Sequence, residues 1–149
     1  MEIKIKKLTN TATIPTSGTK YAAGYDLYAD ITRGSETIPA HKTQKIGTGV
    51  AMEIPEGYVG LIFARSGLST KRGLRPANCV GVIDSDYRGE IIVALHNESE
   101  IAQTIHDKDR IAQIVIIPYL SVEFMEVDSL AETERGEGGF GSTEEKIKK

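Results

Sequence analysis

Two stretches of the sequence combine side chains that could bind an anion or activate a water. The first, Ala64-Arg-Ser-Gly-Leu-Ser69, places an arginine, a hydroxyl and a glycine where an apolar strand meets a short helical pattern. Backbone N–H groups at a helix start attract anions, and an arginine adds charge-assisted hydrogen bonds. We therefore expect Arg65, Ser66 and Gly67 to bind phosphate. The alternative is a helix-capping Ser66 beside a solvated Arg65.

The second stretch, Asn78-Cys-Val-Gly-Val-Ile-Asp-Ser-Asp-Tyr-Arg-Gly89, predicts a β-hairpin that carries two carboxylates and a tyrosine. A carboxylate at the end of an apolar strand can be held by its neighbours and accept a proton from a bound water. Asp84 is therefore our candidate general base. Alternatively, residues 84–86 supply only turn hydrogen bonds and Gly89 supplies a positive φ, which would leave the tyrosine and the asparagine unexplained.

Two further polar side chains lie in apolar stretches. Asp26, in Ala23-Gly-Tyr-Asp-Leu27, could hold a metal or a metal-bound water, although a single Asp in a strand commonly faces solvent. Gln113, in Asp109-Arg-Ile-Ala-Gln-Ile114, needs hydrogen-bond partners if it is buried, and needs none if it is exposed on an edge strand. Cys79 and the three histidines show no spacing typical of a metal site or of an activated nucleophile, so we assign them no role.

The segment Arg135-Gly-Glu-Gly-Gly-Phe-Gly-Ser-Thr143 has four glycines in six positions, yet it carries an arginine, a phenylalanine and two hydroxyls. Such a glycine-rich end is expected to be flexible without a ligand. Phe140 could stack on a flat ring, and Arg135 could bind phosphates. Ser142 and Thr143 could donate to a terminal phosphate. We predict a lid that closes over a ligand, with a passive solubilising tail as the alternative.

Composition limits the classes of protein that remain. A length of 149 residues suits one domain with a core. An apolar fraction of 40% and a charged fraction of 26% are typical of a globular protein, and no apolar run approaches a membrane span. The start of the chain lacks a signal-peptide pattern, so we expect a cytoplasmic protein. A formal charge of −3 argues against nucleic-acid binding.

The segments that must position these residues alternate apolar and polar side chains with a period of two, and this pattern predicts an all-β fold. The runs that alternate apolar and polar residues, or read as short apolar strands, cover residues 3–6, 26–31, 46–54, 58–64, 91–96, 110–118 and 122–127. Short turn signals between them, such as Pro55-Glu-Gly57, favour a sandwich, a barrel or a jelly roll. The one expected helix is Gly67–Arg72, with Ser66 as its N-cap and Gly73 as its stop.

Five stretches occur in the order and at the spacing of the five motifs of trimeric dUTP pyrophosphatases (dUTPases), and the chain resembles that family over nearly its whole length. The motifs are Ala23–Leu27, Arg65–Gly67, Gly81–Gly89, Asp109–Gln113 and Arg135–Thr143. The resemblance implies an all-β jelly roll (dUTPase-like β-clip) with one short helix and a flexible C-terminal arm. The catalytic domain would cover residues 1–130 and the arm residues 131–149. It also implies a homotrimer with shared active sites, each built from all three subunits.

The resemblance further implies hydrolysis of dUTP to dUMP and pyrophosphate with Mg²⁺, a reaction that limits uracil incorporation into DNA and supplies dUMP for dTMP synthesis. Matched by position, Asp84 is the carboxylate that activates the water attacking the α-phosphorus. Asp26 matches a carboxylate near the metal's waters. The positions that match substrate-binding residues are Arg65, Ser66, Gly67, Asn78, Val82, Ile83, Tyr87, Ile92, Gln113, Arg135, Phe140, Gly141, Ser142 and Thr143.

Selectivity follows from the positions that match the nucleoside pocket. Those that match the hairpin reading uracil, largely through backbone groups, are Asn78, Val82, Ile83 and Ile92. Tyr87 matches the ring under the deoxyribose. A ribose 2′-hydroxyl pressed on that ring would lose water without gaining a partner, at a cost of ~1–3 kcal/mol. UTP should therefore be a poor substrate, and the fixed backbone groups and the packing around C5 should also exclude dCTP and dTTP.

Two other classes of function stay open. Deoxycytidine triphosphate deaminase is related in fold but lacks the glycine-rich tail, and ammonia release from dCTP would identify it. A non-catalytic module would use the nucleotide pocket as a switch for a regulatory protein partner. Asp84, Arg135 and Phe140 argue for retained catalysis without excluding such a partner. The chain departs from the family at His106-Asp-Lys-Asp109, where a glycine often precedes the Asp, and in the six residues after Thr143.

Overall fold

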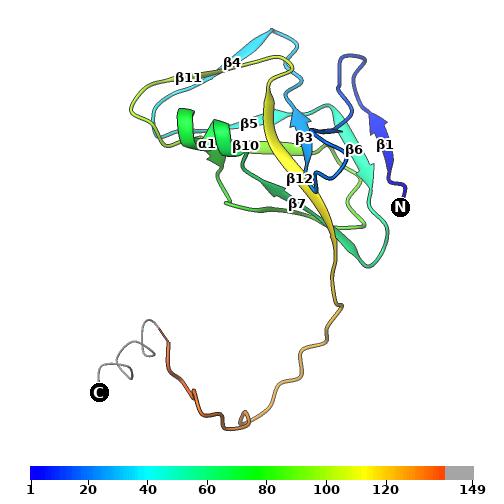
Figure 1. The fold of residues 1–149 in the computed structure, drawn as a ribbon, viewed down its shortest axis with the longest axis vertical. Helices are drawn as coiled ribbons and strands as arrows, with labels where there is room; N and C mark the ends of the chain where they lie inside the picture. The colour runs from blue at the N-terminus through cyan, green and yellow to red at the C-terminus, as the bar shows by residue number, and fades with distance from the viewer. Residues whose placement is uncertain (140–149) are drawn as a thin grey trace.

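The computed structural model describes residues 1–139, which form twelve β-strands and one short helix (Figure 1). The all-β prediction with a single short helix is confirmed. The elements are β1 Lys4–Lys7, β2 Thr16–Ser17, β3 Tyr25–Tyr28, β4 Ser35–Ile38, β5 Thr43–Gly47, β6 Val50–Glu53, β7 Tyr58–Phe63, α1 Ser66–Arg72, β8 Leu74–Pro76, β9 Gly81–Ile83, β10 Ile92–Asn97, β11 Gln103–His106 and β12 Arg110–Pro118. No helix in this part of the chain is long and apolar enough to cross a membrane.

The strands form four antiparallel sheets and do not close into a barrel. The largest sheet has the order β2-β3-β12-β7-β9, and a second has the order β5-β10-β8. The pairs β1-β6 and β4-β11 complete the set. Neighbours in a sheet are often far apart in the sequence, as in the pairing of β3 with β12. Such long-range pairing of short antiparallel strands is typical of a jelly roll.

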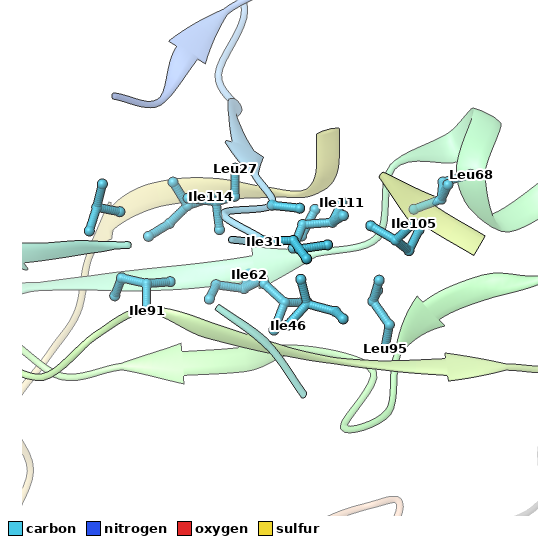
Figure 2. Close-up of a cluster of buried hydrophobic side chains, with 14 of the residues drawn as sticks. Leu27, Ile31, Ile46, Ile62, Leu68, Ile91, Leu95, Ile105, Ile111 and Ile114 are labelled. Carbon is cyan, nitrogen blue, oxygen red and sulfur yellow. The ribbon is translucent and has the colours of Figure 1, made fainter. Parts of the chain in front are cut away.

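The hydrophobic core lies between the five-stranded and the three-stranded sheets (Figure 2). Leu27 of β3 and Ile114 of β12 lie on one side of the cluster. Ile46 of β5 and Leu95 of β10 lie on the other, and all four side chains are at most 2% exposed. Leu68 of α1 packs at one end of the cluster. Each fully buried side chain of this size contributes about 1.5–3 kcal/mol relative to exposure.

The pattern over residues 46–54 predicts one strand, but the structure has two. β5 ends at Gly47 and β6 starts at Val50. Between them Gly49 has a φ of +65°, a left-handed conformation that interrupts a strand and that glycine adopts without strain. The buried Thr48 hydroxyl donates to the carbonyl oxygen of Ile91 at 2.6 Å. The chain therefore passes from the three-stranded sheet to the β1-β6 pair at this point.

The helix forms where expected, but its cap is different. Arg65 occupies the N-cap with extended dihedral angles, and Ser66 is already the first helical residue. No side chain caps this helix end, so capping does not occupy the exposed Ser66 hydroxyl. Gly73 stops the helix with a φ of +64°, as predicted.

The predicted β-hairpin around Asp84 is wrong. β9 pairs with β7 in the five-stranded sheet, whereas β10 lies between β5 and β8 in the other. β8 pairs only with Leu95, His96 and Asn97, so the start of β10 keeps an open edge, but β9 does not pair there and joins β7 instead. Residues 84–91 instead form a loop between the two sheets, with a turn in which Tyr87 N–H donates to the carbonyl oxygen of Asp84 at 3.2 Å.

The segment after β12 contains no strand up to residue 139, so the strand predicted over residues 122–127 is absent. Its last backbone contact with the sheets is Tyr119 N–H to the carbonyl oxygen of Gly57, at 3.0 Å. The chain then runs away from the body (Figure 1). Phe124 is 96% exposed and Leu130 is 87% exposed. An alternating pattern forms a strand only against a partner edge, and this segment has none within the described chain.

Candidate active site

Three of the expected site residues, far apart in the sequence, meet on one face of the five-stranded sheet. In the register of this sheet, Gln113 of β12 lies opposite Asp26 of β3 on one side and Phe63 of β7 on the other. Alternate residues of a strand share a face. Arg65, two residues after Phe63, therefore lies on the side of Asp26 and Gln113. Period-two patterning and sheet register together bring these side chains into reach.

Asp26 binds two arginines. Its Oδ1 accepts from Nε of Arg65 at 2.7 Å, and its Oδ2 accepts from Nη1 of Arg110 at 3.2 Å. The carboxylate is only 14% exposed, so water screens these ion pairs less than it would on an open surface. A bulge at Ile111 shifts the register between β12 and β3 beside this pair. Asp26 thereby fixes the direction of the Arg65 guanidinium.

Gln113 has the partners that a half-buried amide needs. Its Nε2 donates to the carbonyl oxygen of Ala64 at 2.9 Å. On the other side, a Cβ on Gly24 would lie 2.4 Å from Gln113 Oε1, so a side chain at residue 24 would displace the amide of Gln113. β12 lies between β3 and β7, which excludes the alternative of an exposed position on an edge strand. Gln113 therefore ties the centre of the sheet to the segment that enters α1.

These residues line an open groove of about 810 Å³ that reaches the start of α1. Ser66 and Gly67 lie exposed on its wall. The charged side chains that line it are Asp26, Arg65, Lys71, Arg72 and Arg110. Four cations against one carboxylate make this groove positive on a chain whose net charge is −3. A positive groove on an acidic protein attracts anions selectively.

Asp84 lies in a different groove, of about 1080 Å³. It shares this groove with Val82 of β9, with Leu61 of β7 and with Tyr119. Asp84 is exposed and forms no ion pair with any residue in the part of the chain that the structure describes. Its carboxylate is therefore available to a water or a ligand.

The two grooves are well separated along β7. Ile83 pairs with Gly60, so the next residue, Asp84, lies level with Val59. Arg65 follows Val59 by six positions along the same line of chain, and at about 3.3 Å per residue this is roughly 20 Å. One chain therefore brings the phosphate-site candidates together and places the candidate general base elsewhere.

The Tyr87 ring is held over Gly89. Its hydroxyl donates to the carbonyl oxygen of Glu90 at 2.9 Å. A Cβ on Gly89 would lie 2.4 Å from the Tyr87 hydroxyl oxygen, so a side chain there would displace the ring. Gly89 has no positive φ, contrary to the turn interpretation of this stretch. The glycine is needed for the space that it leaves to the ring.

The other substrate-binding candidates between residues 78 and 92 differ in how far their side chains are exposed. Val82 is 59% exposed and Ile92 is 46% exposed, and Asn78 is exposed as well. The partly buried side chain of Ile83 packs against the core, which favours contact with a ligand through its backbone. Of the uracil-pocket candidates, only Val82 lines either of the two grooves described above.

The arm residues are only partly described. Arg135 Nε donates to the carbonyl oxygen of Gly138 at 2.9 Å, within the arm itself. Phe140, Gly141, Ser142 and Thr143 lie outside the described residues, so their predicted contacts remain predictions.

Sequence reasoning missed three residues of the site. Arg110 follows Asp109 in the fourth motif and shares Asp26 with Arg65. Gly24 and Gly89 provide space for Gln113 and for the Tyr87 ring. Arg110 could have been selected as the one cation of its motif, but steric roles of glycine become visible only when the packing is known.

The carboxylates do not form a protein-held metal site. Among residues 1–139, no three His, Cys, Asp or Glu side chains gather in a way that could hold a metal ion, and Asp26 already accepts from two arginines. In nucleotide sites Mg²⁺ keeps several waters and binds substrate phosphates with only one or two carboxylates. The donor set therefore fits an ion that is bound mainly by a phosphate ligand.

Comparison with known proteins identifies close relatives. The dUTPase family model matches residues 10–144. A deoxyuridine 5′-triphosphate nucleotidohydrolase of Nautilia profundicola is 50% identical over 145 residues, which cover 96% of this chain and 99% of the relative. One from Desulfitobacterium hafniense is 51% identical over 131 residues, with 87% and 86% covered.

Solved structures agree with the sequence relatives. A mutant of the Staphylococcus bacteriophage 80alpha dUTPase with dUpNHpp superimposes with a TM-score of 0.87 at 30% identity, covering 95% of this chain and 98% of the phage protein. A mutant dUTPase from phage phi11 of S. aureus, described with a structural Mg(II) ion, gives a TM-score of 0.77 at 28% identity, with 87% and 98% covered.

Proposed function

Since the chain belongs to the dUTPase family and is thus a dUTP diphosphatase, we propose that a water held by Asp84 attacks the α-phosphorus of dUTP. The water oxygen bonds to phosphorus, the bond to the bridging oxygen breaks, and dUMP and pyrophosphate leave. The observation that carries this proposal is the positive groove in which Asp26 fixes Arg65. In a cytoplasm this reaction would limit uracil incorporation into DNA and supply dUMP for dTMP synthesis.

The phosphate chain binds in the positive groove. Arg65 is already oriented by Asp26, so little side-chain entropy is lost when it meets phosphate oxygens. Ser66 and Gly67 offer a hydroxyl and a closely approachable backbone beside it, and Gln113 adds an amide. Preorganised donors of this kind stabilise the charge that develops during phosphoryl transfer, which is commonly the largest catalytic contribution.

Asp84 orients the attacking water. Its carboxylate is exposed and forms no ion pair among the described residues. An ionised aspartate is a weak base near neutral pH, so it takes the proton late in the reaction. General-base assistance of this type is worth about 10²–10⁴-fold.

A complete site requires more than one copy of the chain. Asp84 and Arg65 lie in two grooves that share no lining residue, roughly 20 Å apart along β7, and Asp26 holds the Arg65 guanidinium in its own groove. Asp84 of one copy must therefore meet the positive groove of another. We propose the homotrimer with shared sites that the resemblance implies, since closed rings bring unlike surfaces of identical copies together.

The outer face of the five-stranded sheet supports this assembly. Apart from Gln113, its side chains from β7 and β12 are apolar and are partly buried or exposed in the single chain; they are Val59, Leu61, Phe63, Val115 and Ile117. A contiguous apolar face of this kind marks a protein interface. It also lies between the two grooves, so an interface there would bring the grooves of neighbouring copies together.

Magnesium completes the proposed reaction. When bound, Mg²⁺ supplies charge neutralisation on the triphosphate oxygens. Asp26 is our candidate acceptor for a hydrogen bond from a metal-bound water, in addition to its two arginines. Asp26 would then contact both Arg65 and a water of the hydrated ion.

The Tyr87 ring sets the preference for deoxyribose. Its hydroxyl donates to the Glu90 carbonyl, so it cannot also donate to a ribose 2′-hydroxyl, and the face of the ring offers that group no partner. Uracil would be read beside Asn78 by backbone groups of residues 82, 83 and 92. UTP, dCTP and dTTP should all be hydrolysed much more slowly than dUTP.

The arm closes the site. Arg135 would leave its contact with Gly138 for the phosphates, and Phe140 would stack on uracil. Gly141, Ser142 and Thr143 would cover the γ-phosphate. Ordering the arm costs conformational entropy, so it should close only over a bound nucleotide and open when pyrophosphate leaves.

A pyrophosphate-release assay tests the proposal. The purified protein is given dUTP, UTP, dCTP or dTTP, with and without Mg²⁺, and ammonia is measured in parallel with dCTP. We expect pyrophosphate from dUTP in the presence of Mg²⁺ and little from the others. Absence of release from dUTP would overturn the proposal, and ammonia from dCTP would indicate a deaminase.

A further inference from the structure

Glu90 carries a carboxylate that none of the proposed steps uses. Its Oε1 accepts from the backbone N–H of Gly49 at 2.8 Å, across 41 positions of sequence. It forms no ion pair among residues 1–139. A Cβ on Gly47 would lie 2.5 Å from the same oxygen, so the β5-β6 turn has room for this carboxylate only because residue 47 is glycine.

The backbone beside Glu90 is fastened to the same turn. Ile91 N–H donates to the carbonyl oxygen of Val50 at 2.8 Å. The carbonyl oxygen of Ile91 accepts from the buried Thr48 hydroxyl at 2.6 Å. Both backbone groups of Ile91 are therefore fixed, and the Glu90 carboxylate adds a third attachment one residue earlier. The direction of the Glu90 carbonyl group depends on all three.

That carbonyl group is where the Tyr87 hydroxyl is attached. The hydroxyl donates to it at 2.9 Å, and the ring lies over Gly89. The backbone N–H of Tyr87 in turn donates to the carbonyl oxygen of Asp84. A chain of contacts thus runs from the β5-β6 turn through Glu90 to the Tyr87 ring and the Asp84 turn.

We propose that Glu90 is a positioning residue for Tyr87. By fixing the β5-β6 turn against the loop, its carboxylate directs the Glu90 carbonyl toward the Tyr87 hydroxyl and holds the ring in one orientation. This inference rests on the proposed function, in which the ring lies under the deoxyribose. Glu90 then sets the discrimination between dUTP and UTP without touching either nucleotide.

Four variants test this role. Glu90→Ala removes the acceptor for Gly49, whereas Glu90→Gln keeps an oxygen that can accept the same hydrogen bond. Gly47→Ala leaves Glu90 intact, but its Cβ occupies the position of the carboxylate. Tyr87→Phe removes the hydroxyl that the proposal says is being directed. Melting temperature is measured for each variant, so that a general loss of stability is seen separately.

The main readout is the ratio of kcat/KM for dUTP to kcat/KM for UTP. We expect Glu90→Ala and Gly47→Ala to lower this ratio about three- to tenfold, the effect of losing one hydrogen bond. Glu90→Gln should keep this ratio close to its wild-type value. Tyr87→Phe should lower it similarly, and adding Glu90→Ala to Tyr87→Phe should have little further effect because both changes act through one contact. A lowered melting temperature with an unchanged ratio would overturn the proposal.

A second readout does not depend on turnover. The ring resonances of Tyr87, identified by their loss in Tyr87→Phe, are recorded by NMR in the protein without nucleotide. They should move in Glu90→Ala and Gly47→Ala and keep their wild-type positions in Glu90→Gln. Unchanged resonances in Glu90→Ala would refute the positioning role even if the wild-type protein did not hydrolyse dUTP. Absent dUTP hydrolysis with shifted resonances would refute only the proposed function.

Discussion

Mixing two inactive variants tests whether Asp84 and Arg65 of different copies form one site. Asp84→Asn removes the proposed base, and Arg65→Gln removes the oriented phosphate ligand, so each variant alone should lack turnover. In one chain the two residues are separated by six positions of β-structure, roughly 20 Å. Asp26 also holds the Arg65 guanidinium in a groove that shares no lining residue with the groove of Asp84, so the two side chains of one copy do not converge on one phosphorus.

The expected recovery follows from counting. In equal mixtures, half of the copies carry an intact Asp84 and the other half an intact Arg65. If a site takes these residues from two copies that assemble at random, about a quarter of the sites contain both. The mixture should therefore recover about a quarter of the wild-type activity per site. If both residues came from one copy, no site would be complete.

The assay is pyrophosphate release after the two variants are unfolded together and refolded, with each variant alone and the wild type treated identically. Sedimentation confirms that all samples reach the same oligomeric state. A mixture of Asp84→Asn with the wild type should retain about half of the wild-type activity with or without exchange, so it controls for the yield of refolding. Exchange is measured separately, by capturing one tagged variant and detecting the other with it. No recovery in a mixture whose two variants are captured together would refute assembly of the site across copies.

Three further predictions address the base, the arm and the stability of the fold. Asp84→Asn alone should keep dUTP affinity within about tenfold and lose most of kcat. Calorimetry would measure the affinity and a turnover assay would measure kcat. Wild-type turnover would contradict the assignment of Asp84 as the base. Truncation after Glu134 should leave the circular dichroism spectrum unchanged and remove most turnover, whereas a passive tail predicts full activity. Burial alone would raise the pKa of Asp30, but hydrogen bonds from Thr9, Thr11 and Lys108 and the charge of Lys108 hold it below the ordinary value of 3.8. The folded pKa is therefore lower than the unfolded one, so this stabilisation is present above about pH 4 and is lost as the pH falls through the folded pKa. Thr9→Val should lower the free energy of unfolding by about 1 kcal/mol at pH 7, and urea titrations should show this difference shrinking below pH 4; an equal difference at pH 7 and pH 3 would contradict it.

Local patterns predicted most of the strands. The strand over residues 110–118 matches β12, because a short, mostly apolar run between turn signals is typical of a strand inside a sheet. The end of the helix at Gly73 was also predicted correctly, since a left-handed C-cap strongly favours glycine. Gly49 breaks the predicted run over residues 46–54 because a single residue with φ of +65° can interrupt a continuous apolar pattern.

Local sequence patterns could not predict which strands pair with one another. Nothing local in residues 81–92 shows that β9 joins β7 while β10 joins β5 and β8. The hairpin was predicted because neighbouring strands usually pair. Here β9 pairs with β7, and β10 pairs with a strand as distant as residues 43–47.

The sequence by itself determined the all-β class, the short helix and the identity of the side chains that could bind phosphate or activate water, because these depend on residue type and local periodicity. Only the tertiary structure decided which of them meet. Sheet register brings Asp26, Arg65 and Gln113 together across 39 to 87 positions of sequence. The same register leaves Asp84 on another groove, because residues that pair near opposite ends of β7 cannot approach each other within a rigid sheet.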